Sequence, residues 1–328
     1  MLILAGDIGG TNGRLAIFRD DIILFERSYP STAVGSLAQC LTAFLRDAES
    51  ILGPIKIKIK GACLAVAGVV DKEKGEASTI NLPWTITSLE MSHILNIPNQ
   101  MVMLINDIEA AAFGVMSLGS HQMVKIGGLE ATDRGPKAVI GAGTGLGEAL
   151  IVPLDDMRFK ILATEGGHVD FAPNSPIEIE LLESLAKKFG HVSVERVLSG
   201  PGLMNIYGFL ANKNGVNPSY HNPAEITASA MANKDGLCTR ALEIFCSIYG
   251  AEAGNLALKC LASGGVYITG GIAPAILPFL IRSDFRKTFE TKGRLTWLLQ
   301  KIPVFVVMEQ KLGLIGAQRA IREYPLPI

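Results

Sequence analysis

The stretch that decides the fold is GDIGGTNGRLAIF, residues 6–18, which directly follows the apolar run LILA at residues 2–5. Asp and Gly are ordinary turn residues, so a plain hairpin is one interpretation of this stretch. A phosphate-binding turn is the other, because glycines let the backbone approach a ligand and its N–H groups converge on phosphate oxygens. In both cases the pattern predicts two buried strands, at residues 2–5 and 14–18, joined by a glycine turn.

The same design returns in the middle of the chain. KAVIGAGTGLGEALIV, residues 137–152, again has an apolar run, a glycine turn with a threonine, and a second apolar run. Neither turn fits the dinucleotide pattern GxGxxG or the P-loop pattern GxxxxGK[ST]. Aligning Gly10-Thr11 with Gly143-Thr144 brings the apolar runs into rough register. The repeat predicts two duplicated α/β units that face a shared cleft and hold one phosphate chain.

Strand-like and helix-like runs alternate along the rest of the chain, which is typical of α/β proteins. SPIEIELLESLAKKF, residues 175–189, predicts a helix with Ser175 as N-cap, Pro176 in the first position and Glu178 completing a capping box. Residues 241–262 contain charged side chains and predict a buried helix, not a membrane span. Further strands are predicted at 62–70, 101–107, 266–271 and 303–308, and further helices at 36–51 and 312–323.

Composition narrows the class of protein. A length of 328 residues suggests about two domains, and 48% hydrophobic residues with 35 glycines fit an α/β protein with buried strands. The net charge of −1 offers no attraction for nucleic acid or an anionic membrane. Five cysteines without a CxxC pair argue against a disulfide framework and a zinc site, and MLILAGD does not resemble a signal peptide. We therefore expect a cytoplasmic protein.

Six motifs together resemble one family. They have the order and spacing found in the bacterial glucokinases of the non-ROK type, which are ATP-dependent hexose kinases of the hexokinase/actin/Hsp70 superfamily. The resemblance covers essentially the whole chain, and its two most specific motifs are those at 165–175 and 190–203. The motifs are GDIGGTN (6–12), LINDIEAAAFG (104–114), GAGTGLG (141–147), EGGHVDFAPNS (165–175), GHVSVERVLSGPGL (190–203) and VYITGGIAP (266–274).

The resemblance implies a fold, an activity and an assembly. The fold would be two duplicated actin/hexokinase-like (ribonuclease H-like) domains with the active-site cleft between them. Residues 1–115 and 309–328 would form the small domain, and residues 116–308 the large one. The implied reaction is phosphorylation of D-glucose to glucose 6-phosphate, with ATP and Mg²⁺, in a cytoplasmic homodimer.

Asn106 and Asp107 stand where a predicted buried strand meets a helix start. Both are good N-cap residues, so capping is one interpretation. Ligand binding is the other, because ligands collect at the carboxyl ends of strands in α/β sheets. The resemblance implies that Asp107 is the general base for the sugar 6-hydroxyl and that Asn106 binds a neighbouring hydroxyl.

Three more residues are implied to bind glucose: Glu165, His168 and Glu195. From the residues alone, His168 could be structural, and Glu195 could be a solvated carboxylate paired with Arg196. A carboxylate accepts hydrogen bonds from two hydroxyls, which suits vicinal diols.

The resemblance also implies the ATP site. Gly270-Gly271 would contact the adenosine, although a tight strand–helix turn explains the same pair. Asp7 would hold Mg²⁺, through water. The implied ATP-binding residues are Gly6, Asp7, Ile8, Gly9, Gly10, Thr11, Gly143, Thr144, Gly145, Gly270 and Gly271.

Three other functions are compatible with parts of the sequence. A hexose kinase of broader or different specificity would use the same residues. An actin-like or Hsp70-like ATPase would keep the glycine turns but would not need Glu165, His168 and Glu195. A sugar-sensing repressor would need a DNA-binding segment ahead of the first strand, which we do not expect here.

Overall fold

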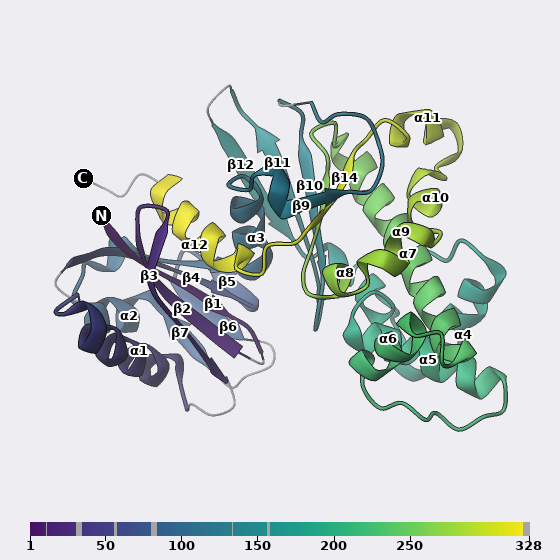
Figure 1. Cartoon of the computed structure of the whole chain (residues 1–328), viewed down its shortest axis with the longest axis horizontal. Helices are drawn as coiled ribbons and strands as arrows, with labels where there is room; N and C mark the ends of the chain where they lie inside the picture. Colours follow the sequence, from purple (N-terminus) through teal and green to yellow (C-terminus); the bar gives the residue numbers. More distant parts are fainter. Residues whose placement is uncertain are drawn as a thin grey trace. The chain divides into compact units, whose positions relative to one another are not determined.

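A computed structural model describes residues 1–10, 12–30, 35–55, 58–79, 84–132, 134–155 and 158–323. The chain forms two compact units (Figure 1). Unit 1 comprises Met1–Leu118 and Glu309–Ile328, and unit 2 comprises Gly119–Met308. The last segment of the chain thus returns to the unit that the first segment begins.

Unit 1 is built on a five-stranded mixed sheet of order β3-β2-β1-β4-β8. The first three strands are antiparallel neighbours, whereas β1, β4 and β8 run parallel. The strands are β1 (Leu2–Ile8), β2 (Asn12–Arg19), β3 (Ile22–Pro30), β4 (Ile59–Val66) and β8 (Val102–Asn106).

The predicted strand at 62–70 is two strands. β4 ends at Val66, and β5 (Gly68–Asp71) joins a small separate sheet with β6 (Glu76–Thr79) and β7 (Thr85–Thr87). Gly68 lies so close to β6 that a Cβ there would overlap Ser78 O. The run is apolar throughout, so its hydrophobicity gave no sign of the change of sheet.

Helices cover both faces of the five-stranded sheet in unit 1 (Figure 1). α1 (Leu37–Leu52) and α2 (Ser88–Leu95) bury their apolar sides together with Leu2, Leu4 and Ile8 of β1. α3 (Asp107–Val115) and α12 (Leu312–Glu323) pack on each other, and α12 also contacts β1 and β4. Because side chains alternate along a strand, the odd-numbered residues of β1 face α12.

Unit 2 contains a six-stranded sheet of order β12-β11-β10-β13-β14-β9. Its first five strands repeat the order and directions found in unit 1: three antiparallel neighbours, then two strands parallel to the third. The turns β1–β2 and β10–β11 occupy equivalent places in the two sheets. The strands are β9 (Met123–Lys125), β10 (Lys137–Ala142), β11 (Leu146–Pro153), β12 (Phe159–Thr164), β13 (Val266–Thr269) and β14 (Val304–Val307).

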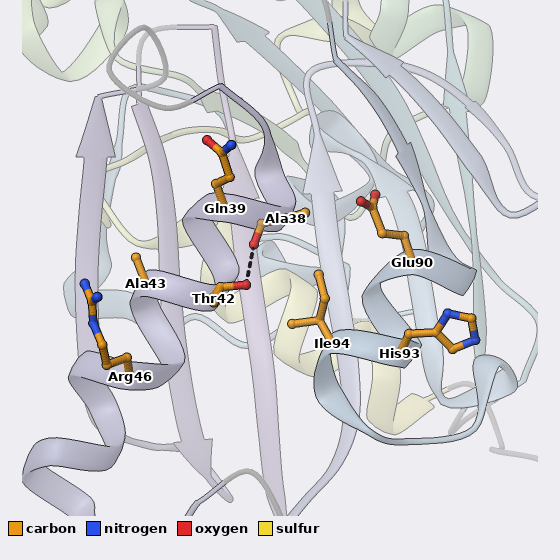
Figure 2. Close-up of a pocket in the computed structure, with 8 residues that line it drawn as sticks. All are labelled: Ala38, Gln39, Thr42, Ala43, Arg46, Glu90, His93 and Ile94. Carbon is orange, nitrogen blue, oxygen red and sulfur yellow. Dashed lines mark hydrogen bonds between the residues drawn. The ribbon is translucent and has the colours of Figure 1, made fainter.

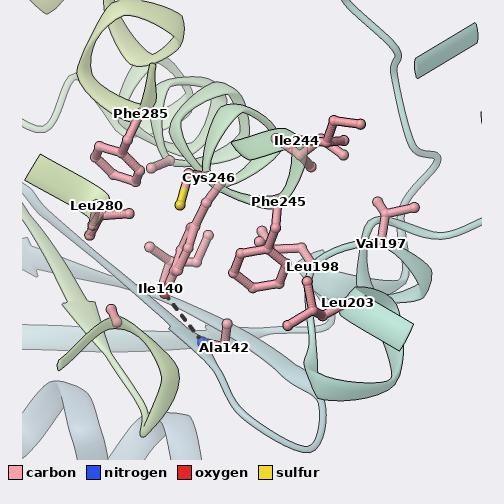
Figure 3. Close-up of a cluster of buried hydrophobic side chains, with 14 of the residues drawn as sticks. Ile140, Ala142, Val197, Leu198, Leu203, Ile244, Phe245, Cys246, Leu280 and Phe285 are labelled. Atoms are coloured by element: carbon pink, nitrogen blue, oxygen red, sulfur yellow. Dashed lines mark hydrogen bonds between the residues drawn. The ribbon is translucent and has the colours of Figure 1, made fainter. Parts of the chain in front are cut away.

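The core of unit 2 forms around the long helix α7 (Gly236–Cys260), which packs against the sheet (Figure 3). Gly250 and Gly254 let α10 (Phe285–Glu290) approach closely, since a Cβ on Gly254 would lie 2.5 Å from Phe289 O. The buried helix predicted at 241–262 is confirmed as part of α7. In the part of the chain that the structure describes, no helix is long and apolar enough to cross a membrane.

The predicted helix at 175–189 is present in unit 2, with one correction at its N-terminus. α4 spans Pro176–Phe189, but the Ser175 side chain makes no capping hydrogen bond, and Glu178 accepts one from Asn174 N (2.7 Å). The predicted capping box is therefore wrong, because Glu178 is buried and reaches one residue further back. The remaining helices of unit 2 are α5 (Gly200–Lys213), α6 (Pro223–Met231), α8 (Ile272–Ala275), α9 (Leu277–Arg282) and α11 (Thr296–Leu299).

Candidate functional site

The first glycine turn, residues 9–11, joins β1 to β2. Gly9 N donates to Asn12 O at 3.0 Å, while Thr11 lies outside the described residues. The two strands are longer than predicted, because antiparallel pairing continues from Leu2 up to Ile8. Gly6, Asp7 and Ile8 are consequently part of β1 and not of the turn, which corrects the strand bounds of 2–5 and 14–18.

Asp7 is a half-buried carboxylate at the end of β1, beside the beginning of α12. A Cβ on Gly313 would lie 2.7 Å from Asp7 Cγ, so only glycine allows this approach. Burial raises the pKa of Asp7, and the nearby charge of Arg14 lowers it. Arg14 itself donates to Gln310 O at 2.8 Å. A carboxylate in these surroundings is stabilised by the positive end of a helix or by a cation.

Asn106 and Asp107 lie at the same sheet edge as the first glycine turn. Ile8 pairs with Val66, and Val66 pairs with Asn106, so β4 alone lies between the end of β1 and the end of β8. Two strand spacings correspond to about 10 Å between these two strand ends. Ligand sites of α/β sheets are expected at such carboxyl ends.

The structure distinguishes between these two neighbouring residues. Asn106 is the N-cap of α3: its Oδ1 accepts from Ile108 N at 2.9 Å, and its Nδ2 donates to Gly68 O at 3.0 Å. The capping interpretation is therefore confirmed for Asn106. Asp107 is the first residue of the helix and is exposed, and its Oδ1 also accepts from Ile108 N (2.9 Å).

The second glycine turn, Gly143–Gly145, joins β10 to β11 in unit 2. Gly143 N donates to Gly145 O at 2.8 Å, and Thr144 is exposed. The first residue of α5 lies against this turn, since Gly200 N donates to Gly143 O at 2.8 Å. The turn is therefore held by the N-terminus of a 14-residue helix, an end that favours anions.

Gly270 and Gly271 lie at the end of β13, next to the second glycine turn. Gly270 has φ of 82°, and a Cβ there would lie 2.5 Å from Ala142 O, the residue that precedes the turn. α8 begins at Ile272, so the strand–helix turn expected at this pair is confirmed. No atom lies within 4 Å of a Cβ built on Gly271 among the described residues.

Glu195 contacts the second glycine turn directly. Its Oε2 accepts from Leu146 N at 2.9 Å, and a Cβ on Gly145 would lie 2.6 Å from the same oxygen. The neighbouring Arg196 lies over the Phe189 ring instead, with 4.2 Å between the guanidinium carbon and the ring centre. The alternative of a solvated carboxylate paired with Arg196 is therefore wrong.

Glu165 and His168 lie on a short 3₁₀ turn that follows β12. His168 Nε2 is 3.8 Å from Glu165 Oε2, and the two side chains are 53% and 71% exposed, respectively. Gly167 of this turn lies on Leu146, whose carbonyl oxygen a Cβ would overlap. Because Glu195 also contacts Leu146, the structure brings Glu165, His168 and Glu195 together around the second glycine turn.

One charged residue near this cluster was not predicted. Glu148, on β11, is 1% exposed and lies beneath Gly166, whose added Cβ would overlap Glu148 Oε2. The signal was a single glutamate inside the apolar run LGEALIV, in a strand that is otherwise buried or half-buried.

A hollow of about 540 Å³ lies elsewhere, on the outer side of α1 and α2 in unit 1 (Figure 2). None of the predicted site residues lines it. Gln39, Thr42 and Arg46 face it from α1, and Glu90 and His93 from α2.

Comparison with solved structures defines the class of protein. A glucokinase from an Antarctic psychrotroph has a TM-score of 0.83 and 33% identity, over 98% of both chains. A glucokinase from Balamuthia mandrillaris, solved in complex with glucose, has a TM-score of 0.84 and 21% identity, over 98% of this chain and 93% of that one. The structure therefore has the fold of sugar kinases.

Sequence comparison identifies the family within that class. The family model "Glucokinase" matches residues 4–324. The glucokinase of Synechocystis is 38% identical over 96% of each chain. The chain belongs to the glucokinase family, which confirms the resemblance carried by the six motifs.

Proposed function

We propose that this protein transfers the γ-phosphoryl group of ATP to the 6-hydroxyl of D-glucose, giving glucose 6-phosphate. The observation that carries the proposal is the match to glucokinases along nearly the whole chain. The site geometry is compatible with it, because the exposed Glu165 and the half-buried Glu195 lie near a glycine turn held by a helix N-terminus. Phosphoryl transfer depends mainly on such positioning and on charge stabilisation.

Asp107 is the general base in this proposal. It is exposed at the carboxyl end of β8, where it would accept the proton of the 6-hydroxyl as that oxygen attacks the phosphorus. Glu165, His168 and Glu195 would bind the other hydroxyls and orient the sugar. Asn106 would also bind a sugar hydroxyl, in addition to the hydrogen bonds by which it caps α3.

The glycine turns would bind ATP in the same proposal. Backbone N–H groups of the two turns and the hydroxyls of Thr11 and Thr144 would bind the phosphates, and Gly270-Gly271 would contact the adenosine. We propose that the two units are duplicated actin/hexokinase-like domains, with boundaries near residues 115 and 308. The active site would form in a cleft between them, and closure would exclude water.

Mg²⁺ fits the surroundings of Asp7. The carboxylate is half-buried, desolvation raises its pKa, and Gly313 leaves no side chain over it. Asp7 would hold the ion through water. When bound, Mg²⁺ neutralises charge on the transferring phosphoryl group.

The substrate proposal is tested by measuring ADP release in a coupled assay with glucose, mannose, fructose and no sugar. We expect release that depends on glucose and is negligible without sugar. Equal kcat/KM for several hexoses would indicate a kinase of broader specificity. ADP release that is independent of sugar would indicate an ATPase and contradict the proposal.

The metal proposal gives a second prediction. Removing divalent ions with EDTA should abolish glucose phosphorylation, and Mg²⁺ alone should restore it, because Asp7 is an oxygen ligand of the kind that Mg²⁺ prefers. An enzyme that required Zn²⁺ for recovery would contradict this assignment.

We also propose that the enzyme acts in the cytoplasm as a homodimer, as the resemblance implies. Sedimentation equilibrium of the purified protein would give twice the chain mass of 35.0 kDa. A mass of one chain at assay concentrations would contradict the dimer.

A further inference from the structure

Glu148 is a buried glutamate that the proposed reaction does not use. It lies on β11, where it pairs with Ile140 of β10 on one side and with Thr164 of β12 on the other. Only 1% of the residue is exposed. Glu252 of α7, which is 6% exposed, interacts with it electrostatically, so two carboxyl groups are buried between the sheet and this helix.

The turn that carries Glu165 and His168 rests on Glu148. Gly166 N donates to Thr164 Oγ1 at 3.1 Å, and Thr164 Oγ1 donates to the Glu148 carbonyl oxygen at 3.0 Å. The carboxyl group supports the same turn, because a Cβ on Gly166 would overlap Glu148 Oε2. Gly166 has no positive φ, so this close contact, and not the backbone conformation, disfavours a side chain at position 166.

The charges around Glu148 disfavour its ionised form. Among the described residues, Glu148 Oε1 has no hydrogen-bond partner. Burial and the charge of Glu252 together raise the pKa of Glu148 to about 7, against the opposing effect of Lys259. Lys259 is 3.7 Å from Glu252 Oε1 and is thus engaged mainly with that carboxylate.

The other polar groups facing this region have partners of their own. Asn255 Nδ2 donates to Glu252 Oε2 at 3.0 Å, and Lys292 Nζ donates to Asn255 Oδ1 (2.5 Å) and Ala251 O (2.8 Å). Tyr249 Oη accepts from Ala142 N at 3.3 Å. Burial lowers the pKa of Lys292, and Glu252 raises it.

We propose that Glu148 is a positioning residue for glucose binding: its uncharged carboxyl group holds the 165–168 turn so that Glu165 and His168 face the sugar. The inference rests on the proposed role of that turn in binding glucose. When Glu148 ionises, a buried charge beside Glu252 must recruit water. The 165–168 turn covers Glu148 and has exposed side chains, so this turn opens to admit the water.

The protonation of Glu148 sets the direction in which pH changes the glucose affinity. A carboxyl group whose pKa is raised in the folded protein stabilises the folded turn fully below its ordinary pKa of 4.5, and this contribution is lost as the pH rises from 4.5 to about 7. Glucose affinity should therefore fall as the pH rises toward 7 and should level off above that value. One coupled proton allows at most a roughly tenfold loss per pH unit, so we expect about a threefold to tenfold loss between pH 5.5 and 7.

The experiment compares Glu148→Gln, Glu148→Ala, Glu252→Gln and wild type. Glucose Kd is measured by calorimetry without nucleotide from pH 5 to 8, together with KM and kcat. Glu148→Gln keeps the shape of the neutral acid, so it should bind as wild type does at pH 5 and should lack the decrease in affinity toward pH 7. Glu252→Gln removes the neighbouring negative charge that raises the pKa of Glu148, so the decrease in affinity should be smaller and should level off at lower pH.

Glu148→Ala removes the support altogether, so the glucose KM should rise at every pH while kcat changes less. Glu178→Gln is the matched control, because Glu178 is a buried glutamate of the same unit that hydrogen-bonds Asn174 and not the turn. It should keep the pH profile of wild type. Glu165 and His168 are present in all these variants, so the difference between wild type and Glu148→Gln isolates Glu148.

A Glu148→Gln enzyme with the wild-type pH profile would overturn the inference, even if Glu148→Ala did not fold. The proposed sugar site fails separately if Glu165→Ala binds glucose as wild type does. A wild-type protein without glucose phosphorylation would contradict the proposed function itself.

Discussion

Asp107→Asn should lower kcat by about 10²–10⁴-fold, the usual contribution of a general base. The amide is nearly the same size as the carboxylate but cannot take the proton of the 6-hydroxyl. Its oxygen can still accept from Ile108 N, as Asp107 Oδ1 does at 2.9 Å. We therefore expect glucose Kd, measured by calorimetry, to change much less than kcat.

The capping interpretation makes a different prediction for the same variant. Asn106 already caps α3 through Ile108 N, so this cap survives the substitution at position 107. Losing one negative charge from the first helical turn should cost only about 0.3–1 kcal/mol of stability. A folded Asp107→Asn protein with near-normal Tm and near-normal turnover would remove Asp107 from the mechanism.

Glu195→Ala has the second largest expected effect, because Glu195 would serve two partners. It accepts from Leu146 N at 2.9 Å beside the second glycine turn, and we propose that it also binds sugar hydroxyls. Truncation leaves a part-buried N–H and the sugar unpaired, which costs about 1–3 kcal/mol per buried group. We expect kcat/KM for glucose to fall by about 10–100-fold, with a raised KM.

Two further variants separate these roles of Glu195. Glu195→Gln keeps an acceptor for Leu146 N, so it should lie between wild type and Glu195→Ala in glucose KM. Arg196→Ala is the matched control, since Arg196 lies over Phe189 and not against the turn. Glucose kinetics unchanged in Glu195→Ala would show that this carboxylate does not bind the sugar.

The sequence by itself was sufficient for the features that depend on local patterns. The alternation of apolar runs and helical runs predicted an α/β protein, and the repeat around Gly10 and Gly143 predicted glycine turns in equivalent places. The buried helix α7 was readable because its small and apolar residues are contiguous. The six motifs were sufficient to identify the family, because their order and spacing can be read from the sequence without the fold.

Only the tertiary structure decided which distant residues meet. Asp7 lies against Gly313, from the other end of the chain, and Glu195 lies against Gly145 and not beside Arg196 as a solvated pair. Glu148 stands beneath Gly166, and its pKa is set by burial and by the charges of Glu252 and Lys259, which are 104 and 111 positions away in the chain. Periodicity reports which face of an element is buried, but burial against a particular neighbour depends on how strands and helices pack. Because electrostatic and steric interactions act over a few ångströms of space, these contacts become defined only when the chain has folded.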